Sequence, residues 1–447
     1  MKRTSLLLFT LAVLLPIAPA KEATPLLKDR EVKKLADLFA DYFRSRAEED
    51  YKGMSKSFEK LEKQLESTAR SKKVDSLLVS PVDLRAAFSA PMFPDKRPKK
   101  GFLTERSAEF PLAAGQVMKV DYLLQLPKGY RPDTPSPCIL ALPPAKDRLD
   151  QLKNWAEKAY PDALTETAMV VIPYRESGNI DWMSEEGRQL AFFAFTDVYK
   201  QYHVDRLKLF LEGHGPTGPA AVDFASALPT LFSGVILRSF DQAPDTTLLG
   251  NADHLPFLLL SAGEDDAKRL VAEFADEAKA KGVSATIVDA TIEEDGGADE
   301  ASIAKVAEFL TGTRKDVAPK RVTITVPTVV QSSSYWISLA HPDQIFDPEK
   351  PISLEAEVFS ESNEFRVKTP SSVLGFTIYL NDELVDMGKP IKVVHTVVTD
   401  EGEGEAKTLF EGTKARNFEF ALQSWFLNLS GNIGEVYTNS IDVEVPQ

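Results

Sequence analysis

The sequence predicts an α/β protein built around a doubly wound, mostly parallel sheet, with a helical region before it and a β-rich domain after it. Three patterns predict this. In the middle of the chain, short apolar runs alternate with helix-patterned stretches, which is typical of a parallel sheet covered on both faces. Earlier apolar residues recur at three- and four-residue steps, and later ones alternate with polar residues. We expect the divisions 1–20, 21–99, 100–315 and 316–447.

Residues 1–20 have the character of a secretory signal peptide. The segment begins with Lys2 and Arg3, continues with an apolar stretch over 6–15 and ends in small residues. That order is typical of signals removed on export, here after about Ala20. No later apolar run approaches the ~20 residues that a bilayer-spanning helix needs. We expect a mature periplasmic or extracellular chain without a membrane span.

The region over 21–99 is predicted to hold two amphipathic helices and a linker. The proline-rich, basic segment over 90–101 has the composition of the linker. Before it, apolar residues recur at helical spacing, and we expect a helical hairpin that caps a larger unit. Its apolar positions are Leu35, Leu38, Phe39, Phe43, Met54, Phe58, Leu61 and Leu65.

The α/β domain over 100–315 is predicted to alternate strands and helices. We expect strands at 120–126, 138–142, 168–173, 207–212, 233–239, 257–262 and 284–290. We expect helices near 148–159, 184–201, 218–228, 265–281 and 299–311.

The region over 316–447 is predicted to form a small β-sandwich. Its strand candidates are RVTITVP, ISLEAEVF, EFRVKT, GFTIYL, IKVVHTVVT and SIDVEV. One helix is expected over 409–426, and the acidic tract over 400–406 is expected to be a solvated hairpin tip.

Charge and cysteine content narrow the function classes. A formal net charge of −15 should repel phosphate backbones, so nucleic acid is not an expected partner. The single cysteine, Cys138, lies inside the apolar run CILAL, so the exported chain would carry no internal disulfide. The carboxylate groups over 264–266 and 293–295 lack the spacing of an EF-hand. We expect no metal and no cofactor.

The stretch LKLFLEGHGPTGPAA, residues 207–221, has the pattern of a buried strand, a sharp turn and the start of a helix. A strand that leads through G-x-S-x-G into a helix is the nucleophile elbow of α/β-hydrolases. The stretches LQLPKGYRPDTPSPCILAL, VYKQYHVDRLKLFLEGHGPTG and LPFLLLSAGEDD resemble, in order, segments of secreted esterases and prolyl-oligopeptidase-like peptidases. GFTIYLNDELVDMGKPIKVV resembles the β-domain of bacterial secreted proteins in this group. The resemblance covers roughly 100–313 and implies the α/β-hydrolase fold.

The resemblance also implies where the catalytic groups of such an enzyme would lie. Gly215 stands at the serine position and has no attacking atom. Pro216 follows it, where relatives use a backbone N–H to bind the oxyanion, and proline has none. The second donor comes from the loop after the CILAL strand. That loop is Pro143-Pro144-Ala145, so at most the Ala145 amide remains.

Of the two remaining catalytic positions, the acid is retained and the histidine base is missing. Ala298 stands about where relatives carry the catalytic histidine, and its loop over 290–302 contains no histidine. The acid position is retained as Asp266, at the start of a predicted helix, where Asp is favoured in any case. The five histidines are expected to be packing or surface residues: His203, His214, His254, His341 and His395.

Three other residues are candidate nucleophiles with ordinary structural explanations. Thr217 falls in the first helical turn, where threonine commonly caps the helix. Ser239 follows a strand, and the histidine nearest to it in sequence is His254. Cys138 lies in a predicted core strand, where apolar surroundings raise the pKa of a thiol.

We therefore expect an exported α/β-hydrolase-fold protein without catalytic machinery, used for binding or assembly with an unknown protein or small ligand. One alternative is a serine-type esterase or peptidase with a non-standard site, which requires a Ser or Thr beside a histidine above the sheet. Another is a structural component of a cell-envelope or secreted complex. An open, polar-lined cleft would indicate a ligand, and a filled cleft would indicate a scaffold.

Overall fold

The computed structural model describes residues 24–89, 103–112, 116–146, 148–175, 180–293, 295–326, 332–345, 347, 351–428 and 431–446. The expected signal peptide over 1–20 and the expected linker over 90–101 lie outside these ranges. Across the described ranges, no helix combines the length and apolar character that crossing a bilayer requires.

The α/β domain is built on an eight-stranded sheet with the strand order β1-β2-β4-β3-β5-β6-β7-β8. Strand β2 pairs antiparallel with β1 and with β4, and the other pairs are parallel. The strands are β1 (Thr104–Pro111), β2 (Val117–Gln125), β3 (Ser136–Leu142), β4 (Met169–Tyr174), β5 (Val204–His214), β6 (Gly234–Arg238), β7 (Phe257–Ser261) and β8 (Ala285–Asp289). The predicted doubly wound, mostly parallel sheet is confirmed, and β1 is a strand that the sequence patterns missed.

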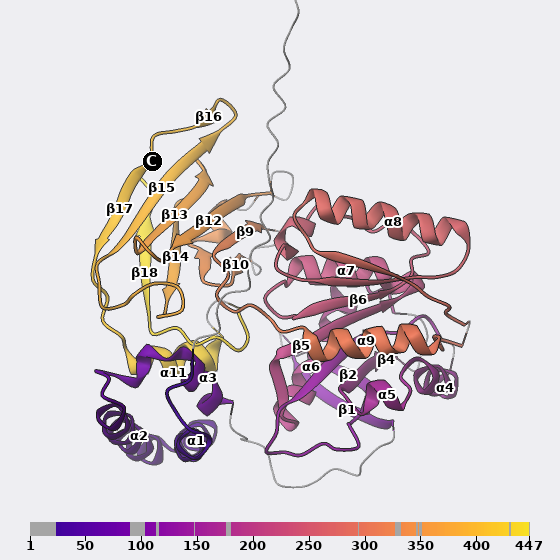
Figure 1. Ribbon diagram of the computed structural model, residues 1–447, viewed down its shortest axis with the longest axis horizontal. Helices are drawn as coiled ribbons and strands as arrows, with labels where there is room; N and C mark the ends of the chain where they lie inside the picture. The colour runs from indigo at the N-terminus through magenta and orange to yellow at the C-terminus, as the bar shows by residue number, and fades with distance from the viewer. Residues whose placement is uncertain are drawn as a thin grey trace, which may run out of the picture.

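Helices cover both faces of this sheet, as Figure 1 shows. Successive residues of a strand point to opposite faces, so Cys138 and Leu140 of β3 pack on one side while Ile139 and Ala141 pack on the other. The first side is covered by α6 (Glu185–Gln201), α7 (Gly218–Ala227) and α8 (Asp265–Ala280), and the second by α4 (Leu149–Ala159), α5 (Asp162–Thr165) and α9 (Glu300–Gly312). The two buried faces explain why these strands are apolar throughout.

The C-terminal domain is a sandwich of two sheets around one apolar core. The smaller sheet holds β10 (Ser333–Ser334), β11 (Ile337–Leu339), β14 (Gly375–Leu380) and β18 (Asn439–Glu444). The larger holds β9 (Arg321–Thr325), β12 (Ser353–Phe359), β13 (Glu364–Pro370), β15 (Ile391–Thr399), β16 (Gly402–Glu403) and β17 (Lys407–Gly412). A short helix, α10 (Pro342–Ile345), follows β11.

The helix expected over 409–426 is wrong in its first part. Residues 407–412 form β17, which pairs antiparallel with β15, and the helix α11 occupies Phe418–Leu427. Asn417 caps it, since its side chain accepts the Phe420 N–H at 2.9 Å. The apolar residues Leu409 and Phe410 belong to a strand that packs on the sandwich core, so their apolar character fitted either structure.

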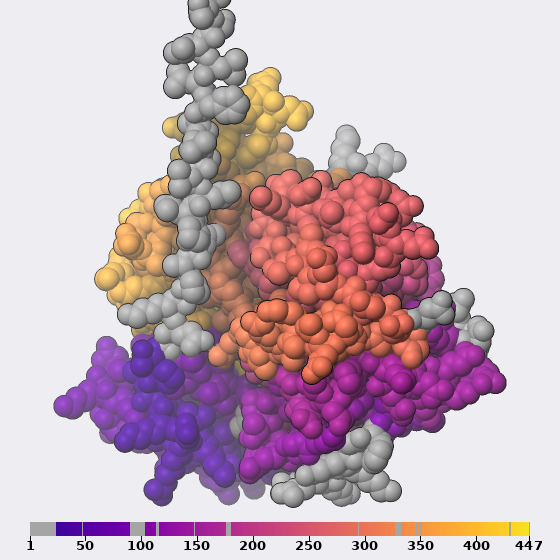
Figure 2. Space-filling model, turned by 45° about the vertical axis from the view of Figure 1, so that its right-hand side comes forward, coloured from indigo at the N-terminus to yellow at the C-terminus, as the bar shows by residue number. Residues whose placement is uncertain are grey.

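The N-terminal region consists of α1 (Asp29–Ala47), α2 (Tyr51–Lys72), η1 (Leu77–Val79) and α3 (Pro81–Phe88). Its apolar faces form one core with Ala421, Leu422 and Trp425 of α11. The expected hairpin therefore covers a helix that is contributed from near the end of the chain (Figure 1). Figure 2 shows this indigo region beside the α/β domain at the base of the view.

Candidate functional site

The turn after β5 is an elbow whose apex carries no side chain. Strand β5 ends at His214, η3 (Gly215–Thr217) makes the turn, and α7 begins at Gly218. Gly215 has φ of +51°, in the left-handed region that side-chain-bearing residues rarely adopt. A Cβ at this position would lie 3.1 Å from Oδ1 of Asp241. An exposed carboxylate therefore lies beside the apex, the position at which the G-x-S-x-G elbow motif has its serine.

The two residues after the apex, Pro216 and Thr217, have structural roles in the turn. Pro216 has no N–H to offer an oxyanion. The Thr217 hydroxyl is buried, accepts the His214 N–H at 2.8 Å and donates to the Leu142 carbonyl at 2.7 Å. Thr217 thus fastens the elbow to the end of β3, and its hydroxyl proton is already used.

The loop after β3 lies beside the elbow, but Pro143 and Pro144 supply no backbone N–H donor. The Pro143 carbonyl accepts a hydrogen bond from the Trp182 indole at 3.3 Å. Pro144 has no N–H, and Ala145 is exposed. The loop therefore presents a carbonyl and two proline rings where a backbone donor was expected from the sequence.

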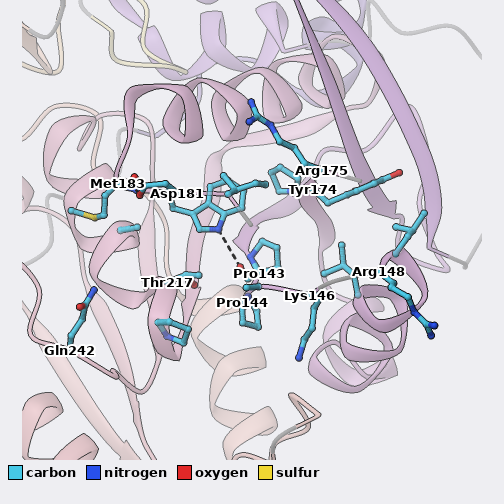
Figure 3. A pocket seen from close by; sticks show the side chains of 18 residues that line it. Pro143, Pro144, Lys146, Arg148, Tyr174, Arg175, Asp181, Met183, Thr217 and Gln242 are labelled. Atoms are coloured by element: carbon cyan, nitrogen blue, oxygen red, sulfur yellow. Dashed lines mark hydrogen bonds between the residues drawn. The ribbon is translucent and has the colours of Figure 1, made fainter. Parts of the chain in front are cut away.

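An open cavity of about 290 Å³ lies over the elbow. Its lining includes Pro143, Pro144, Ala145, Pro216 and Thr217, so the structure brings these predicted positions together. Apolar side chains form much of the remainder: Leu149, Leu152, Ile180, Trp182 and Met183. Charged side chains of both signs and one amide also line it: Lys146, Arg148, Arg175, Asp181 and Gln242. Figure 3 shows Thr217 and Gln242 on one side and Lys146 and Arg148 on the other.

Asp266 and Ala298 do not join that cavity lining. Asp266 lies in the first turn of α8, with its side chain 92% exposed and 3.5 Å from Arg269. Ala298 forms an isolated antiparallel bridge with Ile292 and packs on the core beside α4 and α9. The residue expected at the acid position is therefore a solvated charge, and the residue expected at the base position is a packed alanine.

The strand order, with its antiparallel second strand and a helix directly after the β5 turn, decides the fold. This is the α/β-hydrolase fold. A scan against models of protein families finds no match, and a search of curated protein sequences finds none.

Solved structures with similar folds include hydrolases. A thermostable esterase aligns over 47% of this chain and 63% of its own, at 16% identity and a TM-score of 0.37. The S-formylglutathione hydrolase of Staphylococcus aureus aligns over 48% of this chain and 98% of its own, at 14% identity and a TM-score of 0.35. A protein described as a dipeptidyl aminopeptidase IV from Bacteroides ovatus aligns over 47% and 36%, at 12% identity and a TM-score of 0.38. This chain thus spans less than two thirds of the thermostable esterase.

Beneath the elbow of this hydrolase fold lies a buried polar cluster that sequence reasoning missed. Arg238 Nε donates to Glu212 Oε1 at 2.5 Å, and both side chains have no exposed surface. His214 Nε2 lies 3.1 Å from the Tyr160 hydroxyl. Burial, followed by the Arg238 charge, lowers the pKa of His214 well below its usual value. The sequence contains one signal of this cluster: a single charged residue lies in each of two apolar runs, LFLEG and GVILR.

The other candidate nucleophiles have structural roles. The Ser239 hydroxyl donates to the Ala262 carbonyl at 2.9 Å. His254 lies at the contact with the β-domain, where its ring meets the Arg321 carbonyl and Asp253. The structure therefore does not pair Ser239 with His254. Cys138 is fully buried, and burial raises the pKa of its thiol far above the usual value.

The remaining histidines also have identifiable surroundings. His395 Nε2 lies 2.9 Å from the Thr369 hydroxyl, inside the β-domain and away from the elbow. His203 Nδ1 lies 3.0 Å from the Pro132 carbonyl, and His341 is exposed. Over the described ranges, no group of three or more His, Cys, Asp or Glu residues is placed to hold a metal ion.

Proposed function

We propose that this chain is a non-catalytic α/β-hydrolase-fold protein that binds a small ligand in the cavity over the elbow. The observation that carries the proposal is an apex without a side chain, Gly215, followed by an imino acid, Pro216, below an open cavity. Removing a serine triad costs about 10⁶ in rate, and each oxyanion donor costs about 10² to 10³ more. A site that lacks these groups retains binding without turnover.

The cavity favours ligand binding over a purely structural role. Its volume of about 290 Å³ is close to the lower end of the ~300–1,000 Å³ typical of ligand pockets. Its lining combines apolar walls with polar and charged groups that can orient a ligand. A purely structural role would not require this space to stay open, because side chains packed into it would gain contacts. A role in a cell-envelope or secreted complex therefore ranks behind ligand binding.

The competing proposal is a serine-type esterase or peptidase with a displaced site. Such an enzyme would have the same fold, and it would need a hydroxyl beside a histidine at the carboxyl edge of the sheet. The histidine nearest the elbow, His214, meets the phenol of Tyr160, and Thr369 meets His395 in the β-domain. These contacts support the non-catalytic proposal.

A hydrolase assay separates these two proposals. The purified protein should neither react with a fluorophosphonate probe nor turn over a panel of ester and aminopeptidase substrates, while an active esterase processed in parallel does both. Covalent labelling of any residue in the α/β domain, or turnover that follows the protein through purification, would establish the esterase or peptidase instead.

A cavity-filling variant tests the location of binding. Ala145 is exposed and lines the cavity, so Ala145→Trp should occupy it without disturbing the core. Ala163 of α5 is also exposed and lies outside the cavity lining, so Ala163→Trp is the matched control. Small molecules that raise the melting temperature of the wild type should lose that effect with Ala145→Trp alone. Equal binding by both variants would place the ligand elsewhere.

A further inference from the structure

The two ends of the eight-stranded sheet are protected differently. Strand β1 carries Glu105, Arg106 and Glu109 and ends at Pro111, and such charges and prolines discourage pairing with another strand. Strand β8 has the sequence ATIVD, and its one charge is Asp289 at the end. Among the described residues, β8 pairs with β7 alone, and Ile287 is 43% exposed. An unprotected edge with an exposed apolar residue is a template for a further strand.

The hydrogen bonds to β7 determine which backbone groups of β8 face outward. The Phe257 N–H donates to the Ser284 carbonyl at 2.8 Å, and the Ala290 N–H donates to the Ser261 carbonyl at 2.9 Å. Backbone groups alternate in direction along a strand, so the even-numbered residues of β8 face β7. The N–H and C=O groups of Ala285, Ile287 and Asp289 therefore point to the open edge.

We propose that β8 pairs antiparallel with β8 of a second copy of this chain, about a two-fold axis at Ile287. In an antiparallel pair, residues with outward groups lie opposite each other. This register sets Ile287 against the partner's Ile287 and Ala285 against the partner's Asp289. Every outward N–H and C=O of the three residues finds a partner, and no like charges meet.

The surroundings of β8 are complementary to the same arrangement. Lys279 and Lys281 precede the strand, and Glu293 and Asp295 follow it. Antiparallel pairing brings Lys279 and Lys281 of one copy toward Glu293 and Asp295 of the other, and Lys281 also lies 3.6 Å from Glu277 of its own chain. Helices α8 and α9, which cover opposite faces of the sheet, flank the contact on both sides (Figure 1). A five-residue edge predicts a weak dimer that depends on concentration.

Sedimentation at a series of protein concentrations tests the association. The wild type should dimerise reversibly, and Ile287→Asp, which puts two carboxylates together on the axis, should weaken the dimer by about tenfold or more. Val117 is also an exposed apolar strand residue, at 59%, and it lies on β2, so Val117→Asp is the matched control and should leave the dimer unchanged. A wild type that stays monomeric throughout would overturn the proposal.

A cysteine variant tests the register. Opposed residues of an antiparallel pair have Cα atoms about 5.5 Å apart, within the range that a disulfide spans. Under mild oxidation, Ile287→Cys should form a covalent dimer, while Val117→Cys should not, and the native Cys138 is buried. A dimer that does not cross-link through Ile287→Cys would contradict this register. An unrelated polypeptide bound to β8 would overturn the proposal that the partner is a second copy of this chain. The cavity lining contains no β8 residue, so ligand binding is tested separately.

Discussion

Gly215 and Asp241 together define what the elbow can do. In a nucleophile elbow, a strained turn holds the nucleophile above the sheet. Gly215 has left-handed backbone at such a turn but carries no side chain. Asp241 brings a negative charge to within 3.1 Å of the position that a Cβ would take. A carboxylate at that point opposes the negative oxygen of an acyl-transfer intermediate, so a serine introduced at position 215 alone would not produce hydrolysis.

The apex glycine should nevertheless contribute to stability through its backbone. An L-residue in the left-handed region is strained by about 1–2 kcal/mol, so Gly215→Ala should lower the free energy of unfolding by that amount. Urea denaturation measures the change. Gly250→Ala is the control, because a Cβ there meets no atom within 4 Å and its φ is not positive. Equal stability of the two variants would show that the apex is not strained.

At the scale of elements, periodicity predicted the α/β domain closely. The helix expected near 184–201 forms over Glu185–Gln201, and the helix expected near 265–281 forms over Asp265–Ala280. Strand β1 was not predicted because its sequence, TERSAEFP, has no apolar run. In the structure most of its residues are half-buried or exposed. The elbow was also predictable, since its residues are local in sequence.

Other parts of the site depend on contacts between residues far apart in the chain. The cavity over the elbow combines segments around residues 143, 180 and 216, and no sequence pattern gives its volume. The proximity of Asp241 to Gly215 depends on the packing of β6 beside β5. The N-terminal hairpin could be predicted, but its partner α11 could not, because an amphipathic face does not specify what covers it.

Strands β5 and β6 carry a buried ion pair with one direct hydrogen bond, from Arg238 Nε to Glu212 Oε1. Glu212 and Arg238 have no exposed side-chain surface. Within the described structure, Arg238 Nη1 and Nη2 and Glu212 Oε2 have no hydrogen-bond partner. The pair is therefore costly to keep and more costly to break, because removing one charge leaves the other buried and uncompensated.

A double-mutant cycle should reveal this coupling. Glu212→Met and Arg238→Met should each lower the free energy of unfolding by about 3–5 kcal/mol, since each leaves an unpaired charge. The double variant should lose clearly less than the sum of the two single variants. Chemical denaturation of the four proteins measures the cycle. Additive losses would show that the two side chains contribute independently.

Across the whole molecule, three parts of the chain meet around buried charges. Arg85 of α3 bonds Glu383 of the β-domain at 2.6 Å and Glu435 at 2.9 Å. Lys315, between the α/β and β-domains, donates to the Thr230 carbonyl at 2.8 Å and to the Ile433 carbonyl. Arg206 stacks on Trp425 of α11 at 3.8 Å. These contacts tie the N-terminal region and both larger domains at one junction.

Lys315 should make stability depend on pH in the alkaline range. Burial lowers its pKa to about 7, with Arg206 and Arg85 acting in the same direction and Glu435 opposing them. The unfolded chain keeps the proton up to the ordinary lysine pKa, so unfolding binds a proton between about pH 7 and 10. The fold should therefore gain roughly 1 kcal/mol per pH unit over this range relative to Lys315→Met.

Denaturation of both proteins at pH 7, 8 and 9 checks this prediction. The difference between their free energies of unfolding isolates the lysine from other titrating groups. Parallel pH profiles for the two proteins would contradict it and would indicate that Lys315 keeps its proton in the folded state.

The packing of α11 against the N-terminal helices has a consequence for biosynthesis. The helices α1 and α3 are synthesised early, but Leu422 and Trp425, which cover their apolar faces, are synthesised more than three hundred residues later. At ~5–20 residues per second, these faces wait uncovered for roughly tens of seconds. During that interval a holding chaperone has a binding surface, and a chain that stops short of α11 leaves its first helices permanently without a partner.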